Sequence, residues 1–67
     1  MQYQLIASNF WNTRRISTVK LPIIHGDMWY ESCLFVGSNN EVLDRYATLS
    51  EAILGHNRLA KQYGLKY

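Results

Sequence analysis

Apolar and polar residues follow a helical period in the C-terminal third of the chain, between residues 45 and 64. Apolar side chains recur there every three or four positions, which places them on one stripe of an α-helix. Thr48 and Glu51 stand at the spacing of a capping box: the hydroxyl accepts from the amide of Glu51, and the carboxylate accepts from the amide of Thr48. We therefore predict a helix that begins after Thr48. The predicted apolar stripe consists of Leu49, Ala52, Ile53, His56, Leu59, Ala60 and Tyr63.

Three other positions in this segment have specific expectations. Gly64 suits the left-handed residue that follows a helix, and Leu65 then folds back onto the last apolar turn. Gly55 lies in mid-helix, where glycine costs about 1 kcal/mol relative to alanine, so close packing or a bend is expected there. His56 lies on the apolar stripe, which favours a buried imidazole bonded to a neighbouring strand over a ligand or catalytic histidine.

Strand patterns precede this helix. Residues 16–24, 29–36 and 41–47 are rich in β-branched and aromatic residues and predict three strands. Residues 29–36 are apolar on both faces, which is typical of a central strand covered on both sides. Pro22 lacks an amide donor, so its strand lies at an edge or ends near that point. Residues 2–7 predict a short fourth strand. The predicted connections are residues 8–13, 25–27 and 37–40.

These elements predict an α+β fold, an antiparallel meander of three to four strands packed on one C-terminal helix. The 67 residues form a single small domain, and 48% hydrophobic residues argue against disorder. One helix covers only one face of such a sheet. The other face must then be covered by the N-terminal segment, by a second copy of the chain or by a partner.

Charge and cysteine content restrict the class of protein. Seven Lys or Arg against five Asp or Glu give a net charge of +2, and the basic residues are scattered, which argues against strong nucleic-acid binding. The single Cys33 excludes an intramolecular disulfide and fits a reducing compartment. The sequence contains no long apolar run and no leader-like segment. We expect a cytoplasmic protein without membrane contact.

Three motifs resemble a group of very small, mostly uncharacterised proteins encoded by bacteriophages and prophages. The motifs are ISTVKL at 16–21, YESCLF at 30–35 and RYATLSEAILGH at 45–56, and the resemblance, from Ile16 onward, covers about three quarters of the chain. The chain departs from the group at Ser32 and Cys33 and in a short connection before residue 29. Residues 1–15 form an N-terminal extension outside the resemblance. The resemblance implies a phage-encoded accessory protein of the bacterial cytoplasm and brings no established activity.

Four aromatic residues are candidates for binding a partner: Phe10, Trp11, Trp29 and Tyr30. Large aromatic side chains dominate the energetics of protein interfaces. The alternative for Phe10 and Trp11 is that they fold over an open face of the sheet.

Glu31 and His56 form a candidate polar pair. Glu31 shares a strand face with Trp29, Cys33 and Phe35, and His56 lies on the helix stripe. If this strand face meets the helix, a carboxylate–imidazole hydrogen bond ties helix to sheet and raises the pKa of the imidazole. A role in specifying the fold is favoured over a functional role.

No motif for catalysis, for a cofactor or for a metal is evident. The residue types of a metal site occur at His25, Asp27, Cys33 and His56, but their spacing matches no known ligand pattern. No catalytic motif surrounds any serine, and no phosphate-binding glycine loop is present. We therefore expect neither an enzyme nor a cofactor.

The sequence favours a protein-binding module that occupies a surface on a host or phage protein. One such function is the inhibition of a bacterial defence or regulatory complex. Homodimerisation through the same surface competes with this function. The alternative is a small nucleic-acid-binding accessory protein, in which tyrosine or tryptophan stacks on bases. Its phosphate contacts would come from Arg14, Arg15, Lys20 and Arg45.

Overall fold

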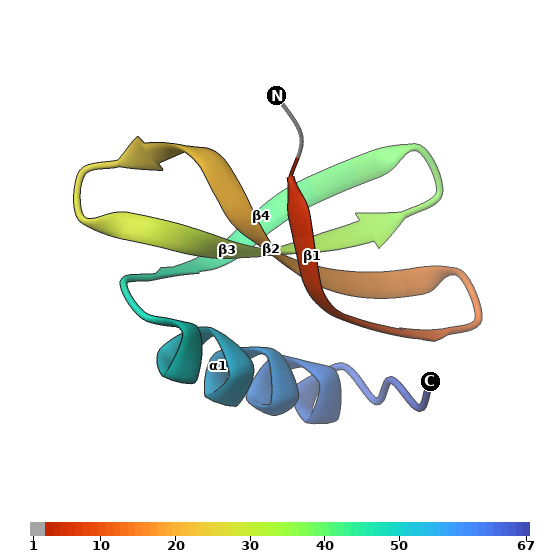
Figure 1. Ribbon diagram of the computed structural model, residues 1–67. Coiled ribbons are helices and arrows are strands. Elements are labelled where there is room, and N and C mark those ends of the chain that lie inside the picture. The colour runs from red at the N-terminus through yellow and green to blue at the C-terminus, as the bar shows by residue number, and fades with distance from the viewer. Residues whose placement is uncertain (1–2) are drawn as a thin grey trace.

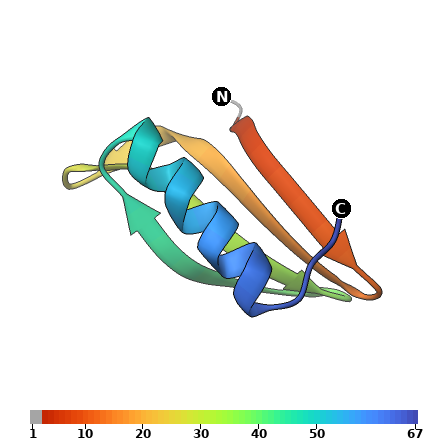
Figure 2. The ribbon, with the colours of Figure 1, turned by 90° about the horizontal axis from the view of Figure 1, so that it is seen from below.

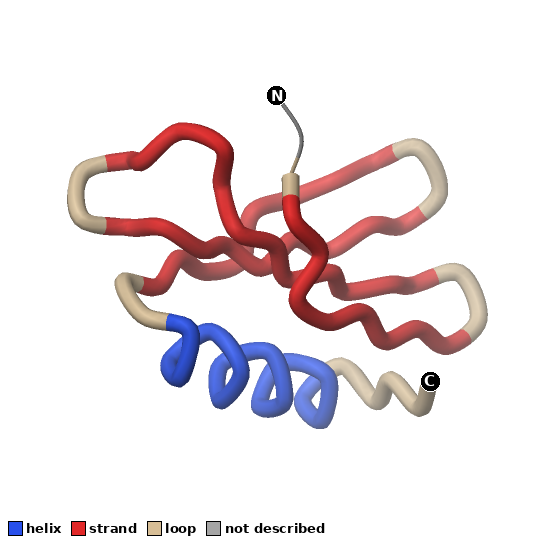
Figure 3. Tube along the Cα trace, viewed as in Figure 1, coloured by secondary structure: helices blue, strands red, loops and turns tan. Residues whose placement is uncertain are grey.

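A computed structural model describes residues 3–67, apart from the side chains of Ile24 and His25. Four antiparallel strands form one sheet in the order β1-β2-β3-β4, and one helix crosses one of its faces (Figures 1 and 3). The predicted α+β meander with one C-terminal helix is confirmed. The elements are β1 (Gln4–Trp11), β2 (Arg14–His25), β3 (Met28–Val36), β4 (Asn39–Tyr46) and α1 (Leu49–Gln62).

β1 is longer than predicted. The turn expected over residues 8–13 is wrong, because the strand continues to Trp11, which pairs with Arg14. Only Asn12 and Thr13 form the turn, and Asn12 has a φ of 57°. Asparagine tolerates this left-handed conformation, so two residues suffice to reverse the chain. Part of the N-terminal extension therefore becomes an edge strand of the sheet.

Pro22 lies in a stretch of β2 where the pairing with the neighbouring strands is interrupted. β2 pairs with β1 only as far as Lys20, which lies opposite Gln4, and its pairing with β3 is interrupted between Lys20 and His25. Because proline cannot donate to a ladder, it fits this unpaired stretch. The prediction that this strand lies at an edge or ends near Pro22 is wrong, because β2 is an inner strand and continues to His25; only its pairing is interrupted there.

The ends of α1 follow the predicted chemistry, with one difference. Thr48 Oγ1 accepts from the amide of Glu51 at 3.2 Å and also donates to the Glu51 carboxylate at 2.9 Å. The carboxylate therefore meets the Thr48 hydroxyl instead of the expected Thr48 amide. At the other end Gly64 has a φ of 70°, and the amide of Leu65 donates to the carbonyl of Ala60 at 2.8 Å. This is the expected left-handed cap.

The buried stripe of α1 is rotated from the predicted one. Leu49 and Ile53 are exposed, whereas Gly55 is buried together with His56. The ring of Tyr46 packs directly on the helix backbone at Gly55, where an added Cβ would lie 2.5 Å from the Tyr46 Oη. The sequence pattern counts only apolar side chains, so it misses a face on which the missing side chain is the fitting feature. Close packing explains the mid-helix glycine.

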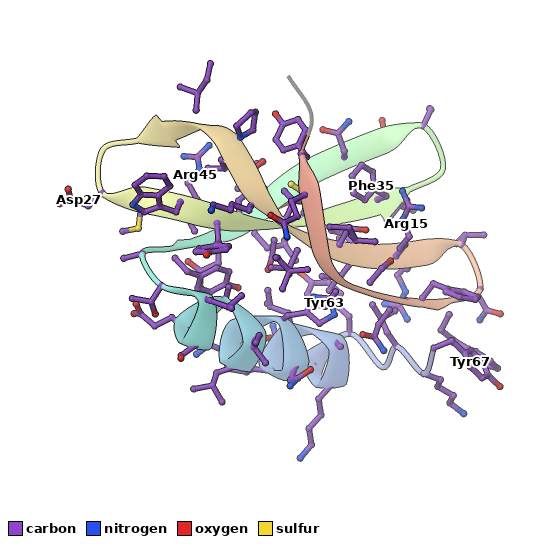
Figure 4. The ribbon with its side chains drawn as sticks, in the orientation of Figure 1. Arg15, Asp27, Phe35, Arg45, Tyr63 and Tyr67 are labelled. Carbon is purple, nitrogen blue, oxygen red and sulfur yellow. The ribbon has the colours of Figure 1, made fainter. Side chains whose placement is uncertain are left out.

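The core lies between α1 and the central strands. Its buried residues include Ile16 of β2 with Leu59 and Ala60 of α1, and Leu65 folds back onto them as predicted. Partly buried side chains close the edges of this cluster, among them Tyr63, which Figure 4 shows between helix and sheet. Figure 2 shows α1 running diagonally across the strands.

The face of the sheet away from α1 is not covered by any described residue (Figure 1). β3 lies between β2 and β4 as a central strand, but it is covered on one side only, which corrects the expectation of cover on both. The N-terminal segment extends the sheet sideways as β1 and does not fold over it. We call this surface the open face. By the strand register it carries Leu5, Ser8, Phe10, Arg15, Ser17, Val19, Glu31, Cys33, Phe35, Asn40, Val42 and Arg45.

Candidate functional site

A continuous chain of hydrogen bonds crosses the interface between helix and sheet. His56 Nε2 lies 2.8 Å from Asn9 Oδ1, and His56 Nδ1 lies 2.7 Å from Thr18 Oγ1. Thr18 Oγ1 lies 2.5 Å from Ser32 Oγ, which lies 3.0 Å from Tyr46 Oη. The five residues come from β1, α1, β2, β3 and β4, so this polar chain links every element of the fold.

One order of donors satisfies the whole polar chain. With Asn9 Oδ1 as acceptor, His56 carries its proton on Nε2, and the unprotonated Nδ1 accepts from the hydroxyl of Thr18. Each hydroxyl has one proton, so Thr18 accepts from Ser32, and Ser32 accepts from Tyr46. Burial lowers the pKa of His56 and raises the pKa of Tyr46. A neutral imidazole and a protonated phenol therefore fit this order.

The centre of the polar chain is closed to solvent, while Asn9 at one end is half-buried. Thr18 and Ser32 are 0% exposed and His56 is 1% exposed. Among the described residues, every buried side-chain nitrogen or oxygen has a hydrogen-bond partner. A site of this kind has no access for a substrate, and its paired groups are typical of a network that specifies one packing of helix on sheet.

The predicted bond between Glu31 and His56 is wrong. Both imidazole nitrogens of His56 are bonded within the polar chain, and Glu31 lies on the open face, where its Oε2 accepts from Arg45 Nε at 3.3 Å. The predicted rise in the pKa of His56 is also wrong, since burial without a charged partner lowers it. Alternation had placed Glu31 on one face of β3, but the helix covers the other face, at Ser32.

A hollow of about 550 Å³ lies on the open face. Figure 4 shows Arg15 and Phe35 on this side of the sheet, and the Arg15 guanidinium lies 4.8 Å from the centre of the Phe35 ring. Because the strands are twisted, the side chains around the hollow stand higher than those at its centre. The hollow is lined by Tyr3, Leu5, Ser8, Arg15, Ser17, Val19, Glu31, Cys33, Phe35 and Asn40.

Glu31 is the acidic group of the hollow, and its charge is compensated. It is 9% exposed, Arg45 lies at one oxygen, and the thiol of Cys33 donates to the other at 3.6 Å. Burial, and after it the charge of Glu31, raises the pKa of Cys33 to about 11. The thiol stays protonated at neutral pH, so Cys33 is neither an activated nucleophile nor a ready metal ligand.

The four aromatic residues predicted to bind a partner do not form one cluster. Phe10 and Trp11 lie beside the turn between β1 and β2, where each ring centre is 5.7 Å from that of Tyr67. Trp29 and Tyr30 lie near the other end of the sheet, close to the start of α1. Phe10 and Trp29 are exposed, whereas Trp11 and Tyr30 are half-buried.

Sequence reasoning missed Leu5, Arg15, Val19 and Phe35 as lining of one hollow. Their signal is alternation along three strands, which groups them on one face but does not show which face the helix covers. A second exposed apolar patch lies on the outer side of α1, at Leu49, Ile53 and Leu54.

The basic residues do not gather into one cationic surface. Arg45 is paired with Glu31, Arg15 lies over Phe35, and Lys20 lies 5.8 Å from the ring centre of Trp29. Arg14 belongs to the opposite face of β2 from Arg15.

No group of three histidine, cysteine, aspartate or glutamate side chains comes together as metal ligands within the part of the chain that the structure describes. Cys33 lies on the open face and His56 on the helix side. The His25 side chain lies outside the described residues. Within residues 3–67 no helix is long and apolar enough to span a membrane.

Comparison with known proteins finds no matching family model, no matching curated protein and no matching solved structure. The resemblance to small phage-encoded proteins therefore stays a prediction.

Proposed function

We propose that this protein is a small protein-binding module that docks on another protein through its open face. The observation that carries the proposal is a sheet face that no described residue covers, with a hollow of about 550 Å³ at its centre. Leu5 is 61% exposed there, and Val42 is also exposed. Apolar side chains gathered on one uncovered face are the usual mark of an interaction surface.

The charges of the open face favour a protein over a nucleic acid as the partner. Nucleic-acid affinity comes mainly from unpaired Lys and Arg along the phosphates. On this face the charge of Arg45 is already compensated by Glu31 at 3.3 Å. Arg15 remains as the basic residue of a hollow that is lined by both apolar and polar side chains. Such a surface suits an apolar anchor side chain with a polar or acidic neighbour.

The partner we propose is a host or phage protein of the bacterial cytoplasm, in keeping with the resemblance of the sequence. Occupying a surface of such a protein would make this chain an inhibitor of the complex that normally uses that surface. The competing occupant of the open face is a second copy of the chain, which would give a symmetric dimer.

The test is a pull-down from bacterial lysates, infected and uninfected, with tagged protein as bait. The variant is Leu5→Lys with Val42→Lys, because both side chains are exposed, and substitutions at exposed positions are expected to change stability little. The control is Leu54→Lys, which places one lysine on the outer side of α1, where the side chain is 70% exposed. Bound proteins are identified by mass spectrometry, and the affinity of each purified candidate is measured directly.

We expect a specific protein whose affinity falls about tenfold or more with the open-face variant and stays unchanged with Leu54→Lys. A partner that binds both variants equally well would contradict docking on the open face. Sedimentation of the purified chain tests the second copy as occupant: a dimer that the open-face variant dissociates would assign this face to self-association. Retarded DNA or RNA in a gel shift at low salt would support the nucleic-acid alternative instead.

A further inference from the structure

The two edge strands of the sheet, β1 and β4, differ in how well they are protected against pairing with a further strand. β4 carries Glu41, Asp44 and Arg45, and charged residues are a common means of keeping an exposed edge from pairing. β1 contains no charged residue over its eight positions. Its register shift between Leu5 and Ala7 is its one irregularity. The outer edge of β1 is therefore better suited than that of β4 to pair with an added strand.

The C-terminal tail already pairs with this edge. The amide of Tyr67 donates to the carbonyl of Phe10 at 3.1 Å, and the amide of Phe10 donates to the carbonyl of Tyr67. Two residues that exchange both bonds form a hydrogen-bonded pair of an antiparallel ladder. Figure 2 shows the tail passing to β1 from the end of α1. The tail therefore runs antiparallel to β1 and begins a further strand on it.

The alternation of an antiparallel strand gives the next pairing position. Asn9 and Trp11 direct their backbone groups toward β2, while Phe10 directs its own outward to Tyr67. Ser8 lies two residues from Phe10, so its amide and carbonyl also point outward. The Ser8 side chain is turned to Ser17, with 3.3 Å between the two hydroxyl oxygens.

We propose that the outer edge of β1, from Gln4 to Asn9, is a strand-addition site for an extended segment of the partner protein. The added strand runs antiparallel to β1, in the register that Tyr67 begins, and pairs with the amide and carbonyl of Ser8. Side chains of directly paired residues share a face. The residue opposite Ser8 therefore lies beside Ser8 on the open face, at the hollow that Leu5 also lines, and the exposed Leu5 favours an apolar side chain there.

The occupant is a partner segment and not a second copy of β1. In a two-fold pairing centred on Ser8, the strand of the second copy would need the place opposite Phe10, which Tyr67 occupies. This inference rests on the proposed function, because a short edge binds weakly unless the open face also makes contact. Backbone bonds then add affinity, and the hollow adds specificity.

The first experiment measures whether the edge accepts a strand. The full chain is extended after Tyr67 by a short run of alternating threonine and valine, which holds the probe next to the edge at high effective concentration. The matched control extension has proline in place of valine and cannot pair. We expect hydrogen exchange at the Ser8 amide to slow about tenfold or more with the first extension only. Unchanged exchange at Ser8 would overturn the proposal.

The second experiment measures whether the partner uses the edge. Chemical synthesis of the chain with an N-methyl group on the Ser8 amide removes one outward donor and leaves the bonds to β2 in place. Ser8→Ala is the control, since it changes the side chain and keeps the amide. The partner captured through the open face should bind the N-methylated chain about tenfold more weakly and Ser8→Ala unchanged.

The outcomes separate this inference from the proposed function. Equal binding of the N-methylated and unmodified chains, with loss of binding by the Leu5→Lys and Val42→Lys variant, would overturn strand addition and leave docking on the open face intact. A dimer in sedimentation that N-methylation dissociates would make the occupant a second copy and would also overturn the proposal.

Discussion

The two faces of the sheet are made by neighbouring residues of the same strands, yet they follow different chemistry. On β2, Thr18 faces the helix and is fully buried, while Ser17 lies next to it on the open face. On β3, Ser32 and Cys33 are divided in the same way. The helix side holds a polar chain in which each group is bonded, whereas the open face keeps apolar side chains in solvent.

This difference arises because folding removes water from the helix side of the sheet but not from the open face. A polar group under the helix has no water to bond to, so each one must find a protein partner. The open face is still hydrated, and its uncovered apolar area is available for a later contact. The helix side therefore contributes most to the stability of the fold, and the open face is the surface that we propose for recognition.

The largest difference in unfolding free energy between the two faces is expected from substitutions at two adjacent residues of β2, Thr18 and Ser17. Thr18→Val keeps the shape of the side chain but leaves His56 Nδ1 without its donor and Ser32 without its acceptor. We expect the free energy of unfolding in urea to fall by about 3 kcal/mol, because unpaired buried groups cost about 1–3 kcal/mol each. Ser17→Ala removes one bond at the floor of the hollow and should cost less than about 1 kcal/mol. Equal losses would remove the distinction between the faces.

A smaller loss is expected at the contact of α1 with β4. Gly55→Ala adds a methyl group where the Tyr46 ring already touches the helix backbone. The overlap should cost about 1–3 kcal/mol, which outweighs the gain of about 1 kcal/mol in helix propensity. Leu54→Ala, the matched control on the exposed side of the same helix, should change the unfolding free energy by less than about 0.5 kcal/mol. Stabilisation by Gly55→Ala would show that the ring moves aside freely.

The smallest effect is expected from pH, through His56. Burial lowers its pKa in the folded protein, and its two hydrogen-bond partners, Asn9 and Thr18, are uncharged. Below the ordinary imidazole pKa of 6.5 the unfolded chain then binds a proton that the folded chain does not. The unfolding free energy should therefore be complete above pH 6.5 and should decrease as the pH falls toward 5, by at most about 1.4 kcal/mol per pH unit.

The pH measurement needs a background with one histidine. The chain has two histidines, so introducing His25→Gln into every variant that is compared leaves His56 as the single imidazole. His56→Gln in that background should flatten the dependence between pH 5 and pH 7. A slope that persists without His56 would assign the effect to carboxylates.

The sequence predicts the elements of the fold because these depend on neighbours along the chain. The cap at Thr48, the stop at Gly64 and the strand-like run of residues 29–36 are local signals, and each appears in the structure. The turn at residues 8–13 was predicted too long, because Asn12 reverses the chain in two residues. The helix stripe was misplaced at Gly55, because only the opposing Tyr46 ring gives that glycine its function in packing.

The candidate site depends on which face of the sheet the helix covers, and no local sequence pattern indicates this. Alternation assigns Glu31 and Cys33 to one face of β3 and Ser32 to the other, but the side on which α1 lies is set by the fit of whole surfaces. The small, hydroxyl-bearing residues Thr18 and Ser32 admit the His56 imidazole, whereas the other face carries Phe35, Arg15 and a carboxylate. The sequence by itself therefore determined the strands, the helix and the presence of one sheet face that the helix does not cover. Only the tertiary structure decided which face that is, because side chains distant in sequence must pack and pair at the same time.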